Sequence, residues 1–158
     1  MKPIRFCLLA GLFSICLFTS CKKDPDTTGG GDVVIPKGML AKIDGVAFVA
    51  VSTQGLDMGD VIWLIGSKSD GTTSLTLRLP IDARPGTYAF PASDPQTLNA
   101  YYTYAASKTY GAKSGKIVVT KHDVAAKTIE GTFEIVCESI SDNSTVSLTQ
   151  GKFNMGYQ

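Results

Sequence analysis

Short apolar runs alternate with polar residues along most of this chain, and turn-forming residues separate the runs. Leu75, Leu77 and Leu79 alternate with polar residues, which places a leucine stripe on one face of a strand. Asp44-Gly45 separates two apolar runs, and this dipeptide readily adopts the positive φ values of a type I′ hairpin turn. No window shows the i, i+3, i+4 and i+7 apolar spacing of a convincing helix. The pattern therefore predicts antiparallel strands.

The strands expected from these runs are residues 40–43, 46–50, 61–65, 75–79, 87–90, 98–105, 116–120, 128–137, 145–149 and 152–157. Val61–Ile65 is apolar throughout, which suits a strand buried on both faces. Asp94-Pro95 is a good helix start, but the β-forming residues Tyr101–Tyr104 favour a strand after it. Short strands without helices predict one all-β domain over residues 38–158, an antiparallel β-sandwich or, alternatively, a closed or partly open β-barrel.

The first twenty residues have a different pattern, typical of a secretory signal peptide. Lys2 and Arg5 make the start positive, residues 6–18 are almost entirely apolar, and small residues precede Cys21. Thirteen helical residues reach only about 20 Å, short of the roughly 30 Å hydrocarbon core of a membrane. The pattern therefore predicts a signal peptide over residues 1–20 in preference to a membrane span.

Leu17–Cys21 resembles a bacterial lipobox, although Phe18 stands where leucine is usual. This resemblance implies that the Cys21 thiol carries diacylglycerol and that Cys21 becomes the new N-terminus. Two or three acyl chains there would give nearly permanent membrane attachment. The alternative is an ordinary signal peptide that happens to end near a cysteine. Residues 21–37 are then the lipidated cysteine and a flexible, glycine-rich tether.

Composition excludes several classes of protein. The chain is 44% hydrophobic and 18% charged with a net charge of +1, which fits neither a disordered chain nor a nucleic-acid-binding protein with a concentrated basic face. Loss of Lys2 and Arg5 with the signal peptide changes the net charge to −1. Cys137 is then the only cysteine besides Cys21, so we expect no disulfide and no cysteine-based zinc site, and Cys137 is expected to pack as a small hydrophobe.

The residues that could carry out catalysis or bind metal do not form a recognisable motif. His122 is the only histidine, no Gly-x-Ser-x-Gly motif accompanies it, and we expect it in an exposed turn. Asp57 and Asp60 could offer oxygens to calcium, but a solvated loop is the better interpretation. Glu130, Glu134 and Glu138 are spaced by four, which predicts that they share the solvent face of one strand.

Gly111–Lys116 looks like a phosphate-binding loop, but its spacing is one residue short and a strand follows it. The sequence therefore predicts no catalytic residue, no metal ligand and no cofactor apart from the lipid on Cys21.

Four tyrosines give the one hint of ligand binding. Tyr101, Tyr102, Tyr104 and Tyr110 lie within ten residues, and the alternation of a strand would expose some of them. Exposed tyrosines favour contacts with sugars or proteins, so these four are the candidate ligand-contact residues. Packing against the core is the alternative role.

Further motifs carry a family resemblance: Ala41–Val46, Gly86–Tyr88, Gly115–Thr120 with Asp123, Gly131–Phe133 and Thr149–Phe153. With these motifs the chain resembles a family of small Bacteroidota lipoproteins of unknown function. The resemblance implies an all-β fold and a place in the cell envelope, and it brings no catalytic residues. Lys22-Lys23-Asp24 also resembles the start of such lipoproteins, some of which use a charged stretch here for surface export. Asp26-Thr27-Thr28 resembles the O-glycan acceptor of that phylum, with an uncharged spacer as the alternative.

Together these features predict a lipid-anchored envelope lipoprotein, in the outer membrane, that is a non-enzymatic binding or accessory module. Its expected partners are the membrane and either a glycan or an envelope protein, and no nucleic acid. A small β-barrel that carries an apolar ligand is the first alternative, and a glycan hydrolase is the less favoured one. The sequence leaves a periplasmic and a surface orientation equally open.

Overall fold

The β-forming runs become ten strands in the computed structural model, which describes residues 35–105 and 107–158. The strands are β1 (Gly38–Ile43), β2 (Val46–Val49), β3 (Ser52–Asp57), β4 (Val61–Ser67), β5 (Ser74–Pro80), β6 (Gly86–Phe90), β7 (Asn99–Tyr104), β8 (Lys108–Asp123), β9 (Thr128–Ser139) and β10 (Thr145–Gly156). No helix that could cross a bilayer occurs in the part of the chain that the structure describes. The predicted signal peptide, Cys21 and most of the predicted tether lie outside the described residues.

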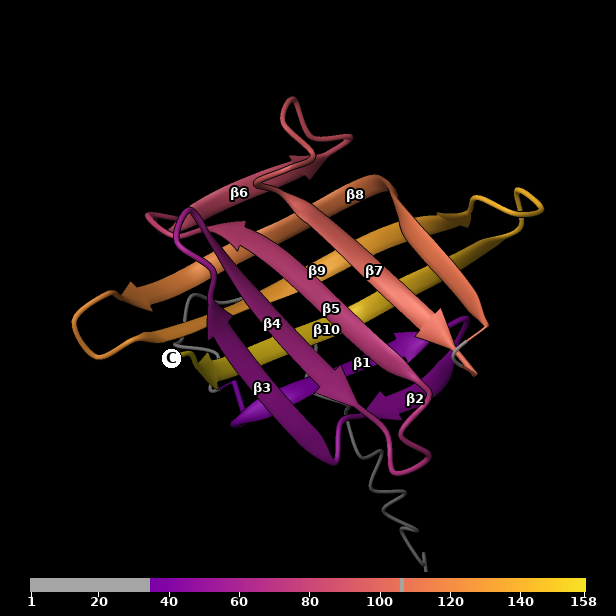
Figure 1. Cartoon of the computed structure of the whole chain (residues 1–158), viewed down its shortest axis with the longest axis horizontal. Coiled ribbons are helices and arrows are strands. Elements are labelled where there is room, and N and C mark those ends of the chain that lie inside the picture. Colours follow the sequence, from indigo (N-terminus) through magenta and orange to yellow (C-terminus); the bar gives the residue numbers. More distant parts are fainter. Residues whose placement is uncertain (1–34, 106) are drawn as a thin grey trace, which may run out of the picture. The chain divides into compact units, whose positions relative to one another are not determined.

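All strand pairs are antiparallel and belong to one sheet, in the order β2-β1-β10-β9-β8-β7-β5-β4-β3. The sheet curls so that β3, β4, β5 and β7 form a layer that crosses in front of β8, β9 and β10 (Figure 1). The long strand β8 joins the two layers, because it pairs with β7 over Lys108–Gly111 and with β9 over Tyr110–Asp123. The short strand β6 pairs with β8 over Gly115–Val119. The register of β8 shifts between Ala112 and Ser114, and this irregularity lets the strand bend.

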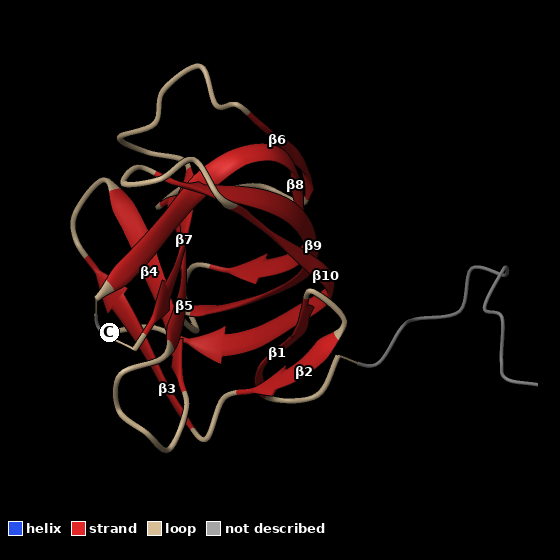
Figure 2. Ribbon diagram, turned by 90° about the vertical axis from the view of Figure 1, so that its right-hand side faces the viewer, coloured by secondary structure: helices blue, strands red, loops and turns tan. Residues whose placement is uncertain are grey.

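The edge strand β3 meets the C-terminal residues that follow β10 (Figure 2). The Gln158 N–H donates to the Gly55 carbonyl (3.1 Å), and the Asp57 N–H donates to the Gln158 carbonyl (2.9 Å). Gly55 is required here, because a Cβ atom at this position would lie 2.2 Å from the Gly156 carbonyl oxygen. The all-β antiparallel prediction is confirmed, and the curled sheet combines the facing layers of a sandwich with the continuous hydrogen bonding of a barrel.

The core lies between the two layers. Leu75, Leu77 and Leu79 are fully buried, so the predicted leucine stripe is confirmed. The largest fully buried side chains are Phe48, Phe133, Phe153, Ile62 and Leu64, which fill the space between the layers. The expectation that Val61–Ile65 is buried on both faces is wrong, because Trp63 and Ile65 point outward and stay half-exposed.

Several element boundaries differ from the prediction. The segment Ser52–Asp57, for which no strand is predicted, is the strand β3, and the two strands expected over 145–149 and 152–157 are the single strand β10. A bulge with Gln150 at φ 52° interrupts the register of β10 without ending it. Asp94 begins only one turn, in which its carbonyl accepts the N–H groups of Thr97 and Leu98, and the strand favoured after that turn is confirmed.

The hairpin turn between β1 and β2 is also confirmed. Asp44 has φ 47° and Gly45 has φ 83°, the two positive values that a type I′ turn requires. Asp44 adds a long-range contact, because its carboxylate accepts the Ser147 N–H at 2.8 Å and ties the turn to β10.

Candidate functional site

The four candidate tyrosines do not form one site. Tyr102 and Tyr110 point into the core, where their ring centroids are 5.9 Å apart, and burial raises the pKa of Tyr102. Tyr104 is 57% exposed at the end of β7. Tyr101 alone lies half-exposed on the outer face of the sheet. Pairing of β7 with β8 brings Tyr102 opposite Tyr110, which explains why both serve packing.

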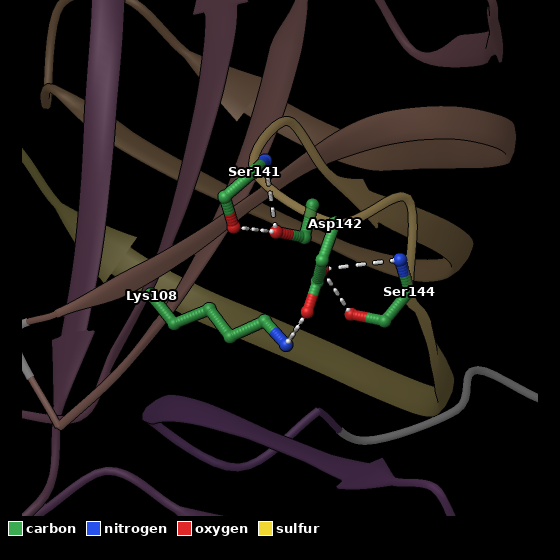
Figure 3. Close-up of polar contacts among 5 residues, drawn as sticks. Lys108, Ser141, Asp142 and Ser144 are labelled. Atoms are coloured by element: carbon green, nitrogen blue, oxygen red, sulfur yellow. Dashed lines mark hydrogen bonds and ion pairs between the residues drawn. The ribbon is translucent and has the colours of Figure 1, made fainter.

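A polar cluster lies at this end of the sheet, beside Tyr110 (Figure 3). The Lys108 Nζ atom is 2.6 Å from Asp142 Oδ2, and Asp142 Oδ1 accepts both the O–H (2.8 Å) and the N–H (3.2 Å) of Ser144. Lys108 and Ser144 hold the pKa of the Asp142 carboxyl well below its usual range. Ser139 and Ser141 share a hydrogen bond between their hydroxyls at 2.8 Å, and no basic side chain contacts either of them among the described residues. The cluster therefore closes the turn between β9 and β10 and offers no activated nucleophile.

His122 lies near the opposite end of the sheet, and the expectation of an exposed turn is wrong. Its Nδ1 atom is 2.7 Å from the Ala83 carbonyl, and its Nε2 atom is 2.8 Å from the Tyr157 hydroxyl. Because a carbonyl only accepts, Nδ1 carries the proton, and in the neutral ring Nε2 accepts from Tyr157. Sequence reasoning missed these contacts because both partners, Ala83 and Tyr157, are distant from His122 in the chain. The histidine joins the end of β8 to the last residues and acts as a structural contact.

The acidic residues are held by neighbours or face solvent. Asp57 accepts the Gly59 N–H at 3.1 Å and pairs with Lys127 at 3.1 Å, and both contacts lower the pKa of its carboxyl. Glu134 is exposed between the buried residues Phe133 and Ile135, as the spacing predicts. Groups of three or more metal-ligating side chains do not occur among the described residues.

Cys137 is free and fully buried, and burial raises the pKa of its thiol to about 12. A thiol with this pKa stays protonated at neutral pH and is a poor nucleophile. The interpretation of Cys137 as a small packing residue is confirmed.

The layer of β3, β4, β5 and β7 carries on its outer side the group of side chains best suited to bind a ligand. Two rows cross the sheet there: Trp63 of β4, Arg78 of β5 and Asn99 of β7 are direct neighbours, and so are Ile65, Thr76 and Tyr101. We call these six half-exposed side chains the Trp63 face. Trp, Tyr and Arg are the residues most enriched where proteins bind partners. The sequence offers a weak signal for this surface in β5, where Thr76 and Arg78 alternate with leucines, but none in β4, where the apolar run Val61–Ile65 is continuous.

Arg78 is the centre of the Trp63 face. Its guanidinium carbon lies 4.8 Å from the centroid of the Trp63 ring, and Nη1 donates to the Pro95 carbonyl over a long 3.4 Å. No carboxylate lies within ion-pair distance of Arg78 among the described residues. Two buried donors, Trp63 Nε1 and Arg78 Nε, have no hydrogen-bond partner in the described part of the chain. Unpaired buried donors are uncommon in native proteins, and they mark this face as unusual.

Two shallow grooves lie on the outer side of the layer formed by β8, β9 and β10. One of about 510 Å³ is lined by residues that include Lys116, Thr132, Glu134 and Lys152. The other, of about 440 Å³, lies on the far side of Lys116 and Glu134, along Ser147–Thr149. Both follow the irregular register of β8 and β10. The one aromatic residue in the lining of these two grooves is Phe133, which is buried in the core, so the grooves are the second candidate surface.

Comparison with known families gives one match. The family described as "Domain of unknown function (DUF6252)" covers residues 37–156, from the start of β1 to the end of β10. No curated protein and no solved structure matches the chain.

Proposed function

We propose that this chain, which belongs to the DUF6252 family of unknown function, is a lipid-anchored envelope lipoprotein whose β domain is a non-enzymatic binding or accessory module. The signal peptide pattern and Cys21 support the anchor, and the glycine-rich residues that follow support a tether. A Bacteroidota outer membrane is the proposed location. The proposed partners are the membrane itself and a glycan or envelope protein.

The Trp63 face is the observation that carries this proposal. Trp63, Arg78 and Tyr101 lie side by side on three neighbouring strands, half-exposed on the solvent side of the sheet. A rigid sheet holds them at fixed spacing, which lowers the entropy lost on binding. Aromatic and guanidinium groups of this kind supply most of the binding energy in many protein contacts.

The alternative functions have less support. A carrier needs an internal cavity of some hundreds of Å³, whereas Phe48, Phe133 and Phe153 occupy the interior. A glycan hydrolase needs an acid and a partner carboxylate that flank a bound sugar. Glu130 and Glu134 instead follow one another along the outer side of β9.

Site-specific photo-crosslinking in the native bacterium tests the proposal. A benzophenone amino acid replaces Thr76, at the centre of the Trp63 face, in the full lipid-anchored chain. We expect irradiation to join the chain to an envelope component, and we expect Trp63→Ala to weaken this product several-fold. Thr145, an exposed outer-face residue of β10, is the matched control position and should give no such product.

Two results would refute this assignment. Crosslinked products in equal amounts from Thr76 and Thr145 would show that the domain contacts envelope components without preference for the Trp63 face. A product from Thr132, in the groove over β8 to β10, without one from Thr76 would move the contact to the second surface.

A further inference from the structure

Hydrogen-bond donors dominate the surroundings of Arg78. Trp63 Nε1 and Arg78 Nε are donors without a partner among the described residues. The Asn99 side-chain oxygen accepts the Ala100 N–H at 2.8 Å, which occupies one of its two lone pairs. The Asn99 amide nitrogen donates to the Tyr101 hydroxyl at 3.0 Å, which leaves the Tyr101 O–H free to donate. A ligand that fits here must therefore supply acceptors.

The positive charge of Arg78 also favours an anionic ligand. Arg78 carries a permanent positive charge and lacks a carboxylate partner within the described residues. Asp94, in the neighbouring turn, is turned away, since its carboxylate accepts from Gln96 and Thr97 of its own loop. A carboxylate matches the planar fork of a guanidinium, with which it forms two parallel hydrogen bonds.

The position of the Trp63 face favours a sugar over a peptide. A peptide strand would bind at a free sheet edge, but the Trp63 face is the broad side of the sheet, and Gln158 already pairs with β3 at the nearer edge. A sugar ring instead packs flat on aromatic side chains and uses nearby hydroxyl and amide groups. Tyr101, Thr76 and Asn99 supply such groups in the rows beside Trp63.

We propose that the Trp63 face binds an acidic saccharide, with Arg78 and Trp63 Nε1 donating to the carboxylate of a hexuronate unit. This inference rests on the proposed binding function and names its ligand class. The long 3.4 Å contact with Pro95 is the one hydrogen bond that holds the Arg78 guanidinium to the described part of the protein. Because Trp63 Nε1 and Arg78 Nε are both buried, the guanidinium must move on the indole for these two donors to reach the ligand.

Trp63 is the only tryptophan in the chain, so its fluorescence reports on this face alone. The full chain in detergent micelles is titrated with trigalacturonate and with its methyl ester, which has the same sugar rings without the charge. We expect a saturable change in emission with the acid and at least tenfold weaker binding of the ester. Arg78→Gln should weaken binding of the acid at least tenfold.

Arg84→Gln is the matched control, because it removes an arginine charge outside the Trp63 face and should bind trigalacturonate as the native chain does. Arg78→Lys keeps the charge but loses the planar fork, and it should bind several-fold more weakly than the native chain. Near-ultraviolet circular dichroism checks that each variant folds. If Arg78→Gln does not fold, Arg78→Lys takes its place in the comparison.

Absence of a saturable change up to millimolar trigalacturonate, in both fluorescence and calorimetry, would overturn the inference. Equal binding of the ester would show that charge is irrelevant, and tighter binding of pentaglutamate would show a peptide ligand, so each of these results also overturns it. If crosslinking from Thr76 persists in any of these cases, the binding function stands and only the acidic saccharide is refuted.

Discussion

The side chain of His122 joins three parts of the chain that are distant in sequence. His122 contacts Ala83 and Tyr157 at once, so one imidazole connects the loop after β5, the end of β8 and the C-terminal residues. Lys127 adds a second contact to the same place, because its ammonium group lies 5.9 Å from the centroid of the Tyr157 ring. Both Ala83 and Tyr157 are buried, so water cannot fully replace the imidazole as their partner.

Replacement of His122 tests this structural role. We expect His122→Leu to lower the free energy of unfolding by about 2 kcal/mol, because a buried carbonyl and a buried hydroxyl both lose their partner. Tyr157→Phe removes only one of the two hydrogen bonds and should cost about 1 kcal/mol. Urea denaturation followed by Trp63 fluorescence measures both values. A His122→Leu variant as stable as the native chain would show that the two contacts contribute nothing.

At the scale of elements, β9 and β10 are joined by a reciprocal arrangement of glycine and phenylalanine. Gly131 lies opposite Phe153, and Gly151 lies opposite Phe133. A Cβ atom at Gly151 would be 2.3 Å from the Phe133 ring, and one at Gly131 would be 2.6 Å from the Phe153 ring. Each phenylalanine ring thus covers the glycine of the neighbouring strand, and the two rings stack with centroids 6.5 Å apart. The glycines make room for the rings at the centre of the core.

Gly151→Ala should disturb this packing. The added methyl group must displace the fully buried Phe133 ring, and overpacking of this kind costs about 1–3 kcal/mol. Gly111→Ala is the matched control, because a Cβ atom there meets nothing within 4 Å, and we expect it to be neutral or slightly stabilising. Thermal unfolding by circular dichroism compares the two variants. Equal melting temperatures would contradict the proposed role of Gly151.

At the scale of the whole molecule, the predicted lipid anchor would decide where the Trp63 face can act. A flexible tether of about fifteen residues has a root-mean-square span of about 20 Å and a maximum near 50 Å. The β domain of a lipidated chain would therefore stay close to the membrane. A ligand for the Trp63 face must be found within that distance, as a component of the envelope would be.

Cys21→Ala tests the anchor. We expect this variant either to leave the membrane fraction or to accumulate as an uncleaved precursor, because the lipid and its processing depend on the Cys21 thiol. Cys16→Ala is the control, because Cys16 lies inside the predicted signal peptide and is not the predicted lipid-attachment residue. This variant should remain membrane-bound and cleaved. Cell fractionation and the intact mass of each chain provide the measurement. A membrane-bound Cys21→Ala variant of the native mature length would exclude lipidation.

The sequence by itself determined features that depend on neighbouring residues. The leucine stripe at Leu75–Leu79 and the Asp44-Gly45 turn are confirmed because strand alternation and turn geometry are local properties. The outward position of Glu134 follows from the same alternation. The family match over residues 37–156 agrees with the predicted unknown-function family and leaves the lipid anchor a prediction.

Tertiary structure alone decided the features that need distant residues. Ser52–Asp57 is a strand because it pairs with β4. The hydrogen bonds and packing of this pairing stabilise the strand more than its weak β propensity destabilises it. Strand alternation already puts Tyr101 and Tyr102 on opposite faces, but only the pairing of β7 with β8 placed Tyr110 opposite Tyr102 in the core. The curl of the sheet gave His122 its two partners.

The Trp63 face shows the same limit for the candidate site. Alternation places Arg78 on an outer face, whereas the continuous apolar run Val61–Ile65 gives no sign that Trp63 faces outward. Only the register of β4, β5 and β7 makes Trp63, Arg78 and Asn99 neighbours. Register is set by long-range hydrogen bonding and by burial of the opposite face, and neither is encoded in a short stretch of residues. Where polar and apolar residues alternate, which side chains face outward is thus a property of the sequence, whereas which of them meet is a property of the folded sheet.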